Sequence, residues 1–185
     1  LQFILPSAIL QGIAFNSANA GSDMAIDIES GFFDRLISSP VARQSILIGR
    51  VGGAAAAAGF QSLVLMAVFL VFGAPVKSGL AGAIALVIIS VLLAVALAGF
   101  GLVVALRTGS PEATQAMFPL IFVAVFVSSA FFPTELMRGW YQQVAEVNPV
   151  SLIINPTREL DITGWSWGDF GQAVGMTLLV AVVSL

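Results

Sequence analysis

Cysteine and histidine are absent from the 185 residues, and charged residues make up only 9% of them. Without cysteine the chain has no disulfide, no thiolate metal ligand and no cysteine nucleophile. Without histidine it lacks the commonest general base and metal ligand. A soluble domain carries roughly 25% charged residues, so this chain cannot cover a water-exposed surface. The net charge is −3, and no basic block points to nucleic acid.

Hydrophobic residues, in contrast, are abundant: they form 58% of the chain, and the mean hydropathy is +1.01. About 20 apolar residues in a helix cross the roughly 30 Å of hydrocarbon in a bilayer. Because a lipid-exposed backbone must satisfy its own hydrogen bonds, we predict an all-α membrane protein. Five spans are predicted, at residues 1–22, 51–72, 80–106, 114–132 and 170–185.

The first and the last predicted spans differ from the others. Residues 1–22 carry no charge but include Gln11, Asn16 and Asn19, which predicts a helix that lines a polar interior. The last run stops without a flanking charge, and the chain begins with Leu1, so we interpret the sequence as part of a longer protein.

The longest connection between predicted spans comprises residues 133–169. It contains three tryptophans and a tyrosine: Trp140, Tyr141, Trp165 and Trp167. Such residues favour the membrane–water interface. We therefore predict a region that dips into the membrane and returns. The positive charges favour the side of Asp23–Arg50 as cytoplasmic by four against three: Arg35, Arg43, Arg50 and Arg107 against Lys77, Arg138 and Arg158.

Residues 23–39 are too charged to span a membrane and predict an amphipathic interfacial helix. Met24, Ile28, Phe32 and Leu36 form an i, i+4 row, and Pro40 marks the end of the helix. Glu29 and Arg35 lie within or beside the apolar arc and need partners, which favours a contact site for another protein. The alternative is an ordinary amphipathic linker between spans.

The run from Glu29 to Pro40 resembles the ABC transporter type-two permeases, the export-type membrane subunits that include drug, lipid and polysaccharide exporters. The matching positions are Glu29, Gly31, Arg35, Leu36, Ser39, Pro40 and the pair Gly49-Arg50. Phe32 stands where threonine is usual, so any role of that hydroxyl is absent here.

Two further stretches resemble the same family, in order and with similar spacing. Residues 110–119 are similar to its loop into the fifth span. Residues 129–133, with Glu135, Gly139-Trp140 and Asn148-Pro149, are similar to its outer re-entrant region. Asn155 and Pro156 precede Arg158 where the family usually has an acidic residue, so the role of that carboxylate is lost here.

The resemblance implies a fold of six spans, one of them before Leu1, with an amphipathic coupling helix at 23–39 and an outer re-entrant region at 133–169. It also implies contacts with a cytoplasmic ATPase and an outer gate. The expected ATPase contacts are Glu29, Gly31, Asp34, Arg35, Leu36, Ser39 and Pro40. The candidate gate residues are Phe131, Phe132, Pro133, Glu135 and Trp140.

The implied function is that of the membrane permease of an ATP-driven exporter in a cell inner membrane. No phosphate-binding loop is present, so we expect no catalytic, cofactor or metal site, with ATP and Mg bound by the partner ATPase. A second permease subunit and membrane lipids complete the expected partners, and the apolar spans favour a hydrophobic drug or lipid as substrate. The alternatives are an ion-coupled carrier and a structural membrane protein. No carboxylate is expected inside a span, which disfavours the carrier.

Overall fold

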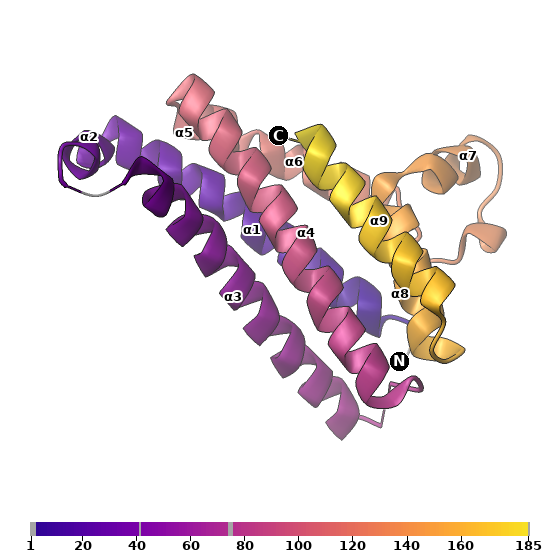
Figure 1. Cartoon of the computed structure of the whole chain (residues 1–185). Coiled ribbons are helices and arrows are strands. Elements are labelled where there is room, and N and C mark those ends of the chain that lie inside the picture. The colour runs from indigo at the N-terminus through magenta and orange to yellow at the C-terminus, as the bar shows by residue number, and fades with distance from the viewer. Residues whose placement is uncertain (1–2, 41, 74–75, 185) are drawn as a thin grey trace.

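The computed structural model describes residues 3–40, 42–73 and 76–184, and every regular element within them is helical (Figure 1). The long helices are α1 (Leu5–Glu29), α3 (Arg43–Val71), α4 (Gly79–Thr108) and α9 (Trp167–Ser184). The shorter ones are α2 (Phe32–Ile37), α5 (Pro111–Gln115), α6 (Met117–Phe126), the 3-10 helix η1 (Thr134–Leu136), α7 (Trp140–Val147) and α8 (Pro149–Ile162). The prediction of an all-α chain is confirmed for the described residues.

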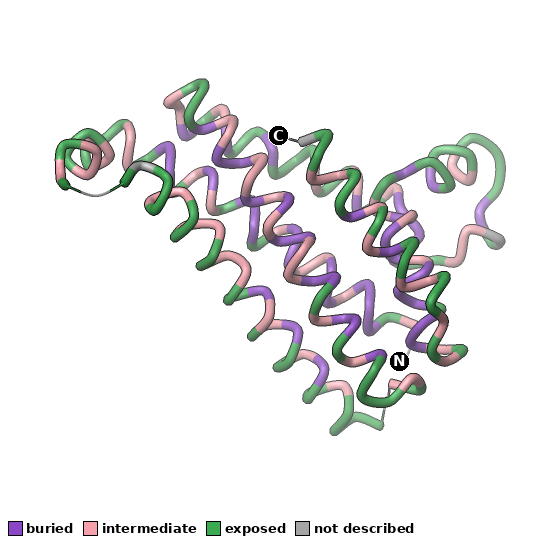
Figure 2. The backbone as a smooth tube through the Cα atoms, in the orientation of Figure 1, coloured by how far each residue is buried: buried purple, intermediate pink, exposed green. Residues whose placement is uncertain are grey.

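Helix α4 is the centre of the bundle, because α1, α3 and α9 all pack along it. Its buried positions recur at helical spacing and include Ala85, Ile89 and Leu93. Figure 2 shows buried residues throughout α1 and α4, whereas α3 is mostly exposed or half-buried. Much of the apolar surface of α3 is therefore not covered by the other residues that the structure describes.

Two glycines bring α1 and α4 into close contact. A Cβ atom on Gly21 would lie 2.7 Å from the backbone of Gly101, and one on Gly101 would lie 3.1 Å from the backbone of Gly21. Only glycine allows two helices to approach this closely, as in many membrane helix pairs. A Cβ atom added to Gly52 or Gly53 on α3, in contrast, would meet nothing within 4 Å.

Two helices, α3 from Gln44 and α4, are long and apolar enough to cross a membrane. They correspond to the predicted spans 51–72 and 80–106, and both extend further than predicted. Helix α4 ends where Gly109 adopts a left-handed conformation with φ 60°. Helix α1 is also long, but its amide and carboxylate side chains keep it out of this class.

The predicted span 114–132 has a different form in the structure. Its residues form α5 and α6, which are separated at Ala116, and α6 ends at Phe126. Pro119 has no N–H to donate to the carbonyl of Gln115, which explains the break. The chain then turns at 127–130, before the boundary of 133 predicted from the sequence.

The predicted single helix at 23–39 is also divided. Asp23 to Glu29 continue α1, and only Phe32–Ile37 form a separate helix. Gly31 lies between the two with φ 71°, a conformation that glycine adopts readily. At the other end of the chain, α9 begins at Trp167, three residues before the predicted span. Residues 1–2 and 185 of the predicted spans lie outside the described residues.

Candidate functional site

The helix α2 protrudes from one end of the bundle, between the end of α1 and the start of α3 (Figure 1). Its charged residues Asp34 and Arg35 are exposed, and so is Glu29 at the end of α1. None of these three charged groups has a hydrogen-bond or ion-pair partner among the side chains that the structure describes. The expected ATPase contacts therefore lie together on one surface with their charges available.

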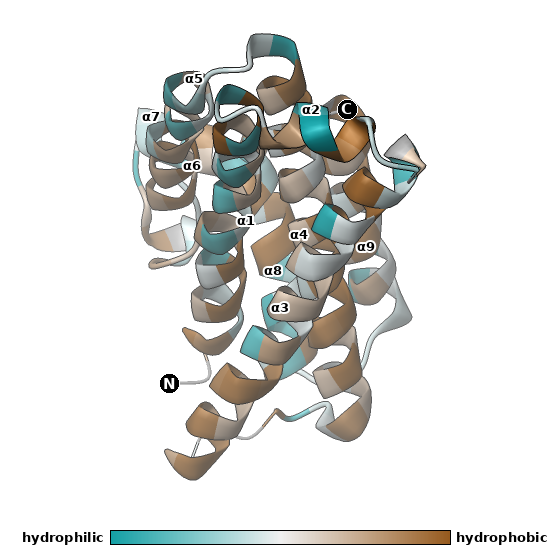
Figure 3. Cartoon of the chain, turned by 90° about the vertical axis from the view of Figure 1, so that its left-hand side faces the viewer, coloured by the Kyte–Doolittle hydropathy of each residue, from teal (hydrophilic) through white to brown (hydrophobic). Residues whose placement is uncertain are grey.

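The apolar residues of this segment attach it to the bundle. Met24 and Ala25 are fully buried against Leu102 and Ala105 of α4, and Ile28 and Phe33 pack on that cluster. Figure 3 shows the hydrophilic residues of α2 on the outer surface above this apolar contact. The predicted apolar row is thus present at Met24 and Ile28, whereas Phe32 is 48% exposed.

The remaining expected contacts shape the end of α2 and the turn that follows. Leu36 is half-buried, and its carbonyl accepts a hydrogen bond of 2.6 Å from the hydroxyl of Ser39. Pro40 is exposed directly after this turn. The side chain of Arg43 lies outside the described residues.

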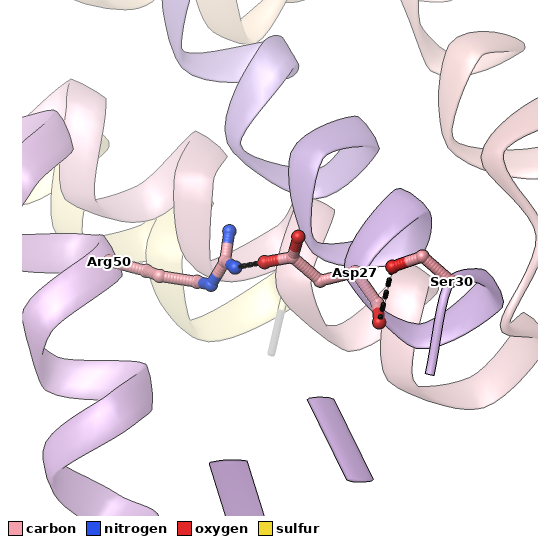
Figure 4. Close-up of polar contacts among 3 residues, drawn as sticks. All are labelled: Asp27, Ser30 and Arg50. Carbon is pink, nitrogen blue, oxygen red and sulfur yellow. Dashed lines mark hydrogen bonds and ion pairs between the residues drawn. The ribbon is translucent and has the colours of Figure 1, made fainter. Parts of the chain in front are cut away.

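An ion pair joins the two long helices on either side of α2. Arg50 of α3 donates to the carboxylate of Asp27 on α1, and their side chains are 23% and 27% exposed. Figure 4 shows this contact, together with the hydroxyl of Ser30, which donates to the backbone oxygen of Asp27 at 3.2 Å. From the sequence, Asp27 was placed on the polar side of the predicted helix and not among the contact residues, whereas Arg50 matches the family pattern.

A polar cavity of about 280 Å³ lies between α1 and α3 beside this ion pair. Asn16 donates to Gln61 across it at 3.4 Å, and Gly12 leaves the space that the Gln61 amide occupies. Asn16, Asn19 and Asp23 are exposed along one side of α1. Two of the amides on which the prediction of a polar interior rests, Asn16 and Asn19, thus lie on an exposed face of α1.

The loop before α5 lies at the same end of the bundle as α2 (Figure 1). The Ser110 hydroxyl accepts a hydrogen bond from the N–H of Ala113 and so caps α5. It also donates to Glu112 at 2.6 Å, which lowers the pKa of that exposed carboxyl. Ser110 is therefore the N-cap of α5, and Pro111 is its first residue.

Side chains of the re-entrant region bind the free carbonyls at the end of α6. Tyr141 donates to the carbonyl of Phe126 at 2.8 Å, and Asn148 donates to that of Ala124 at 2.7 Å. Ser128 donates to Val125 at 2.6 Å. The helix can thus end within the bundle without unsatisfied backbone oxygens.

The candidate gate residues lie along this region. Phe131, Phe132 and Trp140 are exposed, and Pro133 is half-buried. The Phe131 ring continues a series of ring contacts that includes Phe126, Phe122 and Phe15 of α1. The side chain of Glu135 lies outside the described residues.

Arg158 is a buried residue whose position the sequence analysis missed, since it counted this charge with the loop. Its guanidinium is 6% exposed and donates to the Ser7 hydroxyl at 2.7 Å and to the carbonyls of Ser129 and Ala130 at 2.8 and 3.2 Å. It also donates to the carbonyl of Phe3 and lies 3.7 Å from the centre of the Phe3 ring. One helix thus contacts two distant segments through a single side chain.

Asp161 is the second buried charged residue of α8. It is 2% exposed, and neither carboxylate oxygen has a hydrogen-bond partner among the described residues. Burial raises its pKa to about 6, and the charge of Lys77 in the α3–α4 loop opposes this. The sequence did contain a signal for the burial of these two charges. One helix face is formed by residues at the spacing of Ser151, Ile154, Arg158 and Asp161.

The described residues contain no cluster of three carboxylates that could bind a metal ion. A family model described as ABC-2 type transporter matches residues 2–160. Among curated relatives, the chain is 23% identical over 161 residues to the daunorubicin resistance ABC transporter permease protein DrrB1 of Streptomyces coeruleorubidus. This match covers 86% of the chain and 57% of the relative.

Two other relatives cover similar parts of the chain. A protein of Mycobacterium tuberculosis named "Probable doxorubicin resistance ABC transporter permease protein DrrC" is 29% identical, over 85% of this chain and 59% of its own length. The Escherichia coli protein named "Probable multidrug ABC transporter permease YbhR" is 27% identical, over 85% of this chain and 43% of its own length. The chain thus spans less than two thirds of these relatives. No solved structure matches it.

Proposed function

The chain belongs to the ABC-2 type transporter family, and from this premise we propose that it forms the membrane permease of an ATP-driven exporter. The observation that carries the proposal is the position of α2. This short helix presents Asp34 and Arg35, beside Glu29 at the end of α1, at one end of a bundle with two membrane-length helices. None of the three charged groups has a partner in the described part of the chain. A partner protein with complementary charges can bind there.

The proposed energy source is a cytoplasmic ATPase that binds ATP and Mg. ATP would favour a closed ATPase pair, and α2 would transmit this bias to the bundle, since a ligand shifts an equilibrium only by binding its states differently. The Asp27–Arg50 ion pair supports this role because it joins α1 and α3 next to α2. The chain itself would then catalyse no reaction.

The exposed polar face of α1 supports a translocation pathway beside it. Asn16, Asn19 and Asp23 are exposed on a helix of 25 residues whose opposite face is buried in the bundle. Exposed amides and carboxylates are costly against hydrocarbon, so this face is better suited to water or to a second permease subunit. We propose that it lines the pathway in a pair of permeases.

The wider architecture follows the family. We propose six spans in an inner membrane, with one span before Leu1 and the gate residues Phe131, Phe132, Pro133, Glu135 and Trp140 on the outer side. Relatives named for daunorubicin, doxorubicin and multidrug resistance favour a hydrophobic drug as substrate, with a lipid as the other candidate.

The test is copurification of the full-length tagged permease with its ATPase from membranes. We expect the ATPase to copurify with the wild type and to be lost, or to lose its stimulation by the permease, in Glu29→Ala/Arg35→Ala. These two side chains are exposed, so the double variant should fold normally.

A matched control is Arg138→Ala/Glu146→Ala, which removes an exposed pair of the same charges from the re-entrant region. This variant should retain the ATPase. If the wild type retained no ATPase in several mild detergents, a self-contained carrier or a structural membrane protein would become the better description.

A further inference from the structure

The contacts of Arg158 connect three parts of the chain that are distant in sequence. The residue belongs to α8, its acceptors Phe3 and Ser7 lie at the start of α1, and its acceptors Ser129 and Ala130 lie in the turn after α6. The Ser129 hydroxyl also donates to Asn155 of α8 at 2.6 Å, and its N–H donates to the Ser151 hydroxyl at 2.9 Å, so the turn is attached to α8 at several points.

These contacts are costly to break because the donor is a buried cation. No carboxylate of the described residues forms an ion pair with Arg158; its contacts are to carbonyl and hydroxyl oxygens and to the Phe3 ring. Hydrogen bonds from a charged donor are stronger than neutral ones, and a buried cation that loses them is heavily penalised. Separating the start of α1 from the turn at 127–130 would break these hydrogen bonds, so we expect the two segments to move together.

Helix α1 connects this contact to the opposite end of the bundle. It is continuous from Leu5 to Glu29, and 25 helical residues extend about 37 Å. Near its other end, Asp27 pairs with Arg50 beside α2. A displacement of α2 can thus reach the re-entrant turn through one rigid helix.

We propose that Arg158 is a positioning residue that links α1 to the re-entrant turn at 127–130, so that movement at α2 displaces the outer gate. This proposal rests on the proposed function, because the movement at α2 is that of the ATPase cycle. Phe131, Phe132 and Pro133 directly follow the turn, so they would be the first candidate gate residues to move.

A ligand-binding role for the same arginine is less well supported. A cavity of about 330 Å³ adjoins it, but Glu159 lines this cavity and would repel an anion. The guanidinium also already has acceptors in α1, in the turn and in α8. The geometry thus favours a link between segments over an anion site.

The test measures nucleotide-dependent distances at both ends of the bundle. The chain contains no cysteine, so spin labels can be placed at introduced pairs. The inner pair is Ser38→Cys with Leu106→Cys, and the outer pair is Leu136→Cys with Leu80→Cys; all four positions are exposed. The full-length permease and its ATPase are reconstituted in lipid nanodiscs and measured before and after trapping with Mg-ATP and vanadate.

In the wild type we expect both pairs to shift on trapping. In Arg158→Lys the inner shift should remain and the outer shift should be lost, because lysine keeps the charge but cannot form the planar, forked set of hydrogen bonds. Arg138→Lys makes the same change at an exposed arginine and should keep both shifts. ATP hydrolysis should continue in Arg158→Lys while export falls.

An outer shift that persists in Arg158→Lys overturns the proposal. So does a wild type in which only the inner pair shifts, and this result leaves the proposed function intact. A wild type in which the inner pair does not shift overturns the proposed function as well. Should Arg158→Lys fail to fold, Phe3→Leu/Ser7→Ala removes the ring contact and the hydroxyl acceptor but leaves the Phe3 carbonyl, so it weakens the N-terminal side of the link and must reduce the outer shift.

Discussion

Arg50 and Arg158 carry the same charge but are held in different ways. Arg50 is about one-quarter exposed and pairs with the carboxylate of Asp27. Arg158 is buried and is held by backbone carbonyls and one serine hydroxyl. A partly exposed ion pair is exchanged easily with water, whereas a buried cation is not. The first contact is thus suited to a moving end of the molecule and the second to a fixed link.

The contact between Gly21 and Gly101 leads to a prediction about stability. Gly21→Ala places a methyl group 2.7 Å from backbone atoms of α4, so the helices must separate. We expect a loss of about 1–3 kcal/mol in the free energy of unfolding, as for other overpacked sites. Unfolding of the purified protein by SDS titration measures it.

The control for this prediction is Gly175→Ala in α9, where an added Cβ meets nothing within 4 Å. Its stability should be unchanged or slightly higher, since alanine restricts the unfolded chain. Equal losses in the two variants would show that the α1–α4 approach is not the reason.

Asp161 leads to a prediction about pH. Its folded pKa of about 6 lies above the ordinary value of 3.8, so the folded state binds this proton more tightly than the unfolded state. The stability contributed by the neutral carboxyl is fully present below pH 4 and is lost as the pH rises to about 6. Asp161→Asn, which stays neutral, should therefore gain stability relative to the wild type between pH 4 and pH 7.

Thermal unfolding of the wild type and Asp161→Asn at these two pH values checks this result. Asp34→Asn removes an exposed carboxylate and is the control for the loss of one negative charge. A constant offset between wild type and Asp161→Asn would mean that the carboxyl does not change its protonation over this range.

At the scale of the elements, the breaks between helices position the candidate sites. Gly31 separates α1 from α2 and leaves α2 outside the bundle. Pro119 follows the break between α5 and α6, and side-chain donors from 141 and 148 allow α6 to end at Phe126. Each break has a local chemical cause, and each places a short segment at one of the two proposed functional ends.

The Asp27–Arg50 ion pair leads to a prediction about α1 and α3. Asp27→Asn and Arg50→Gln should each reduce the free energy of unfolding by about 0.2–1 kcal/mol, because the pair is partly exposed. Each should also weaken the stimulation of the ATPase by the permease, since α1 and α3 would no longer be joined next to α2. ATPase assays of the reconstituted complex measure the second effect.

The charge-reversed double variant Asp27→Arg/Arg50→Asp is the control for this pair. It restores an ion pair between the same helices and should recover most of the stimulation. If it behaved as the worse of the two single variants, the individual side chains would matter more than the link between α1 and α3.

At the scale of the whole molecule, α3 and α4 form an antiparallel pair whose connection lies at the opposite end from α2 (Figure 1). Helix α3 has 29 residues and extends about 44 Å, which exceeds the roughly 30 Å of a bilayer core. Residues on either side of α3 should therefore lie on opposite sides of the membrane.

This arrangement predicts the labelling of single cysteines, since the chain has none of its own. In intact cells, a membrane-impermeant maleimide should label Lys77→Cys, whereas Ser38→Cys should react only after the membrane is opened. Both positions are exposed in the structure. Labelling of both variants from the same side would exclude a membrane-spanning α3.

The sequence by itself determined the class of the protein and most of its long helices. The scarcity of charge excludes a soluble surface, and long uncharged runs can satisfy their backbone only as helices, so the membrane class and α4 followed directly. The motif at 29–40 also led to the family that the comparison supports. These results depend on composition and local pattern, which are properties of the chain itself.

Only the tertiary structure decided where α6 stops and which charges are buried. The end of α6 depends on donors from Tyr141 and Asn148, which lie 15 and 24 residues away from their acceptors. From the sequence, Arg158 was counted with the charges of the loop at 133–169, because its acceptors, at Phe3, Ser7 and Ser129, become neighbours only through folding. A charge is stabilised by whatever surrounds it in space, and the local sequence does not contain that information.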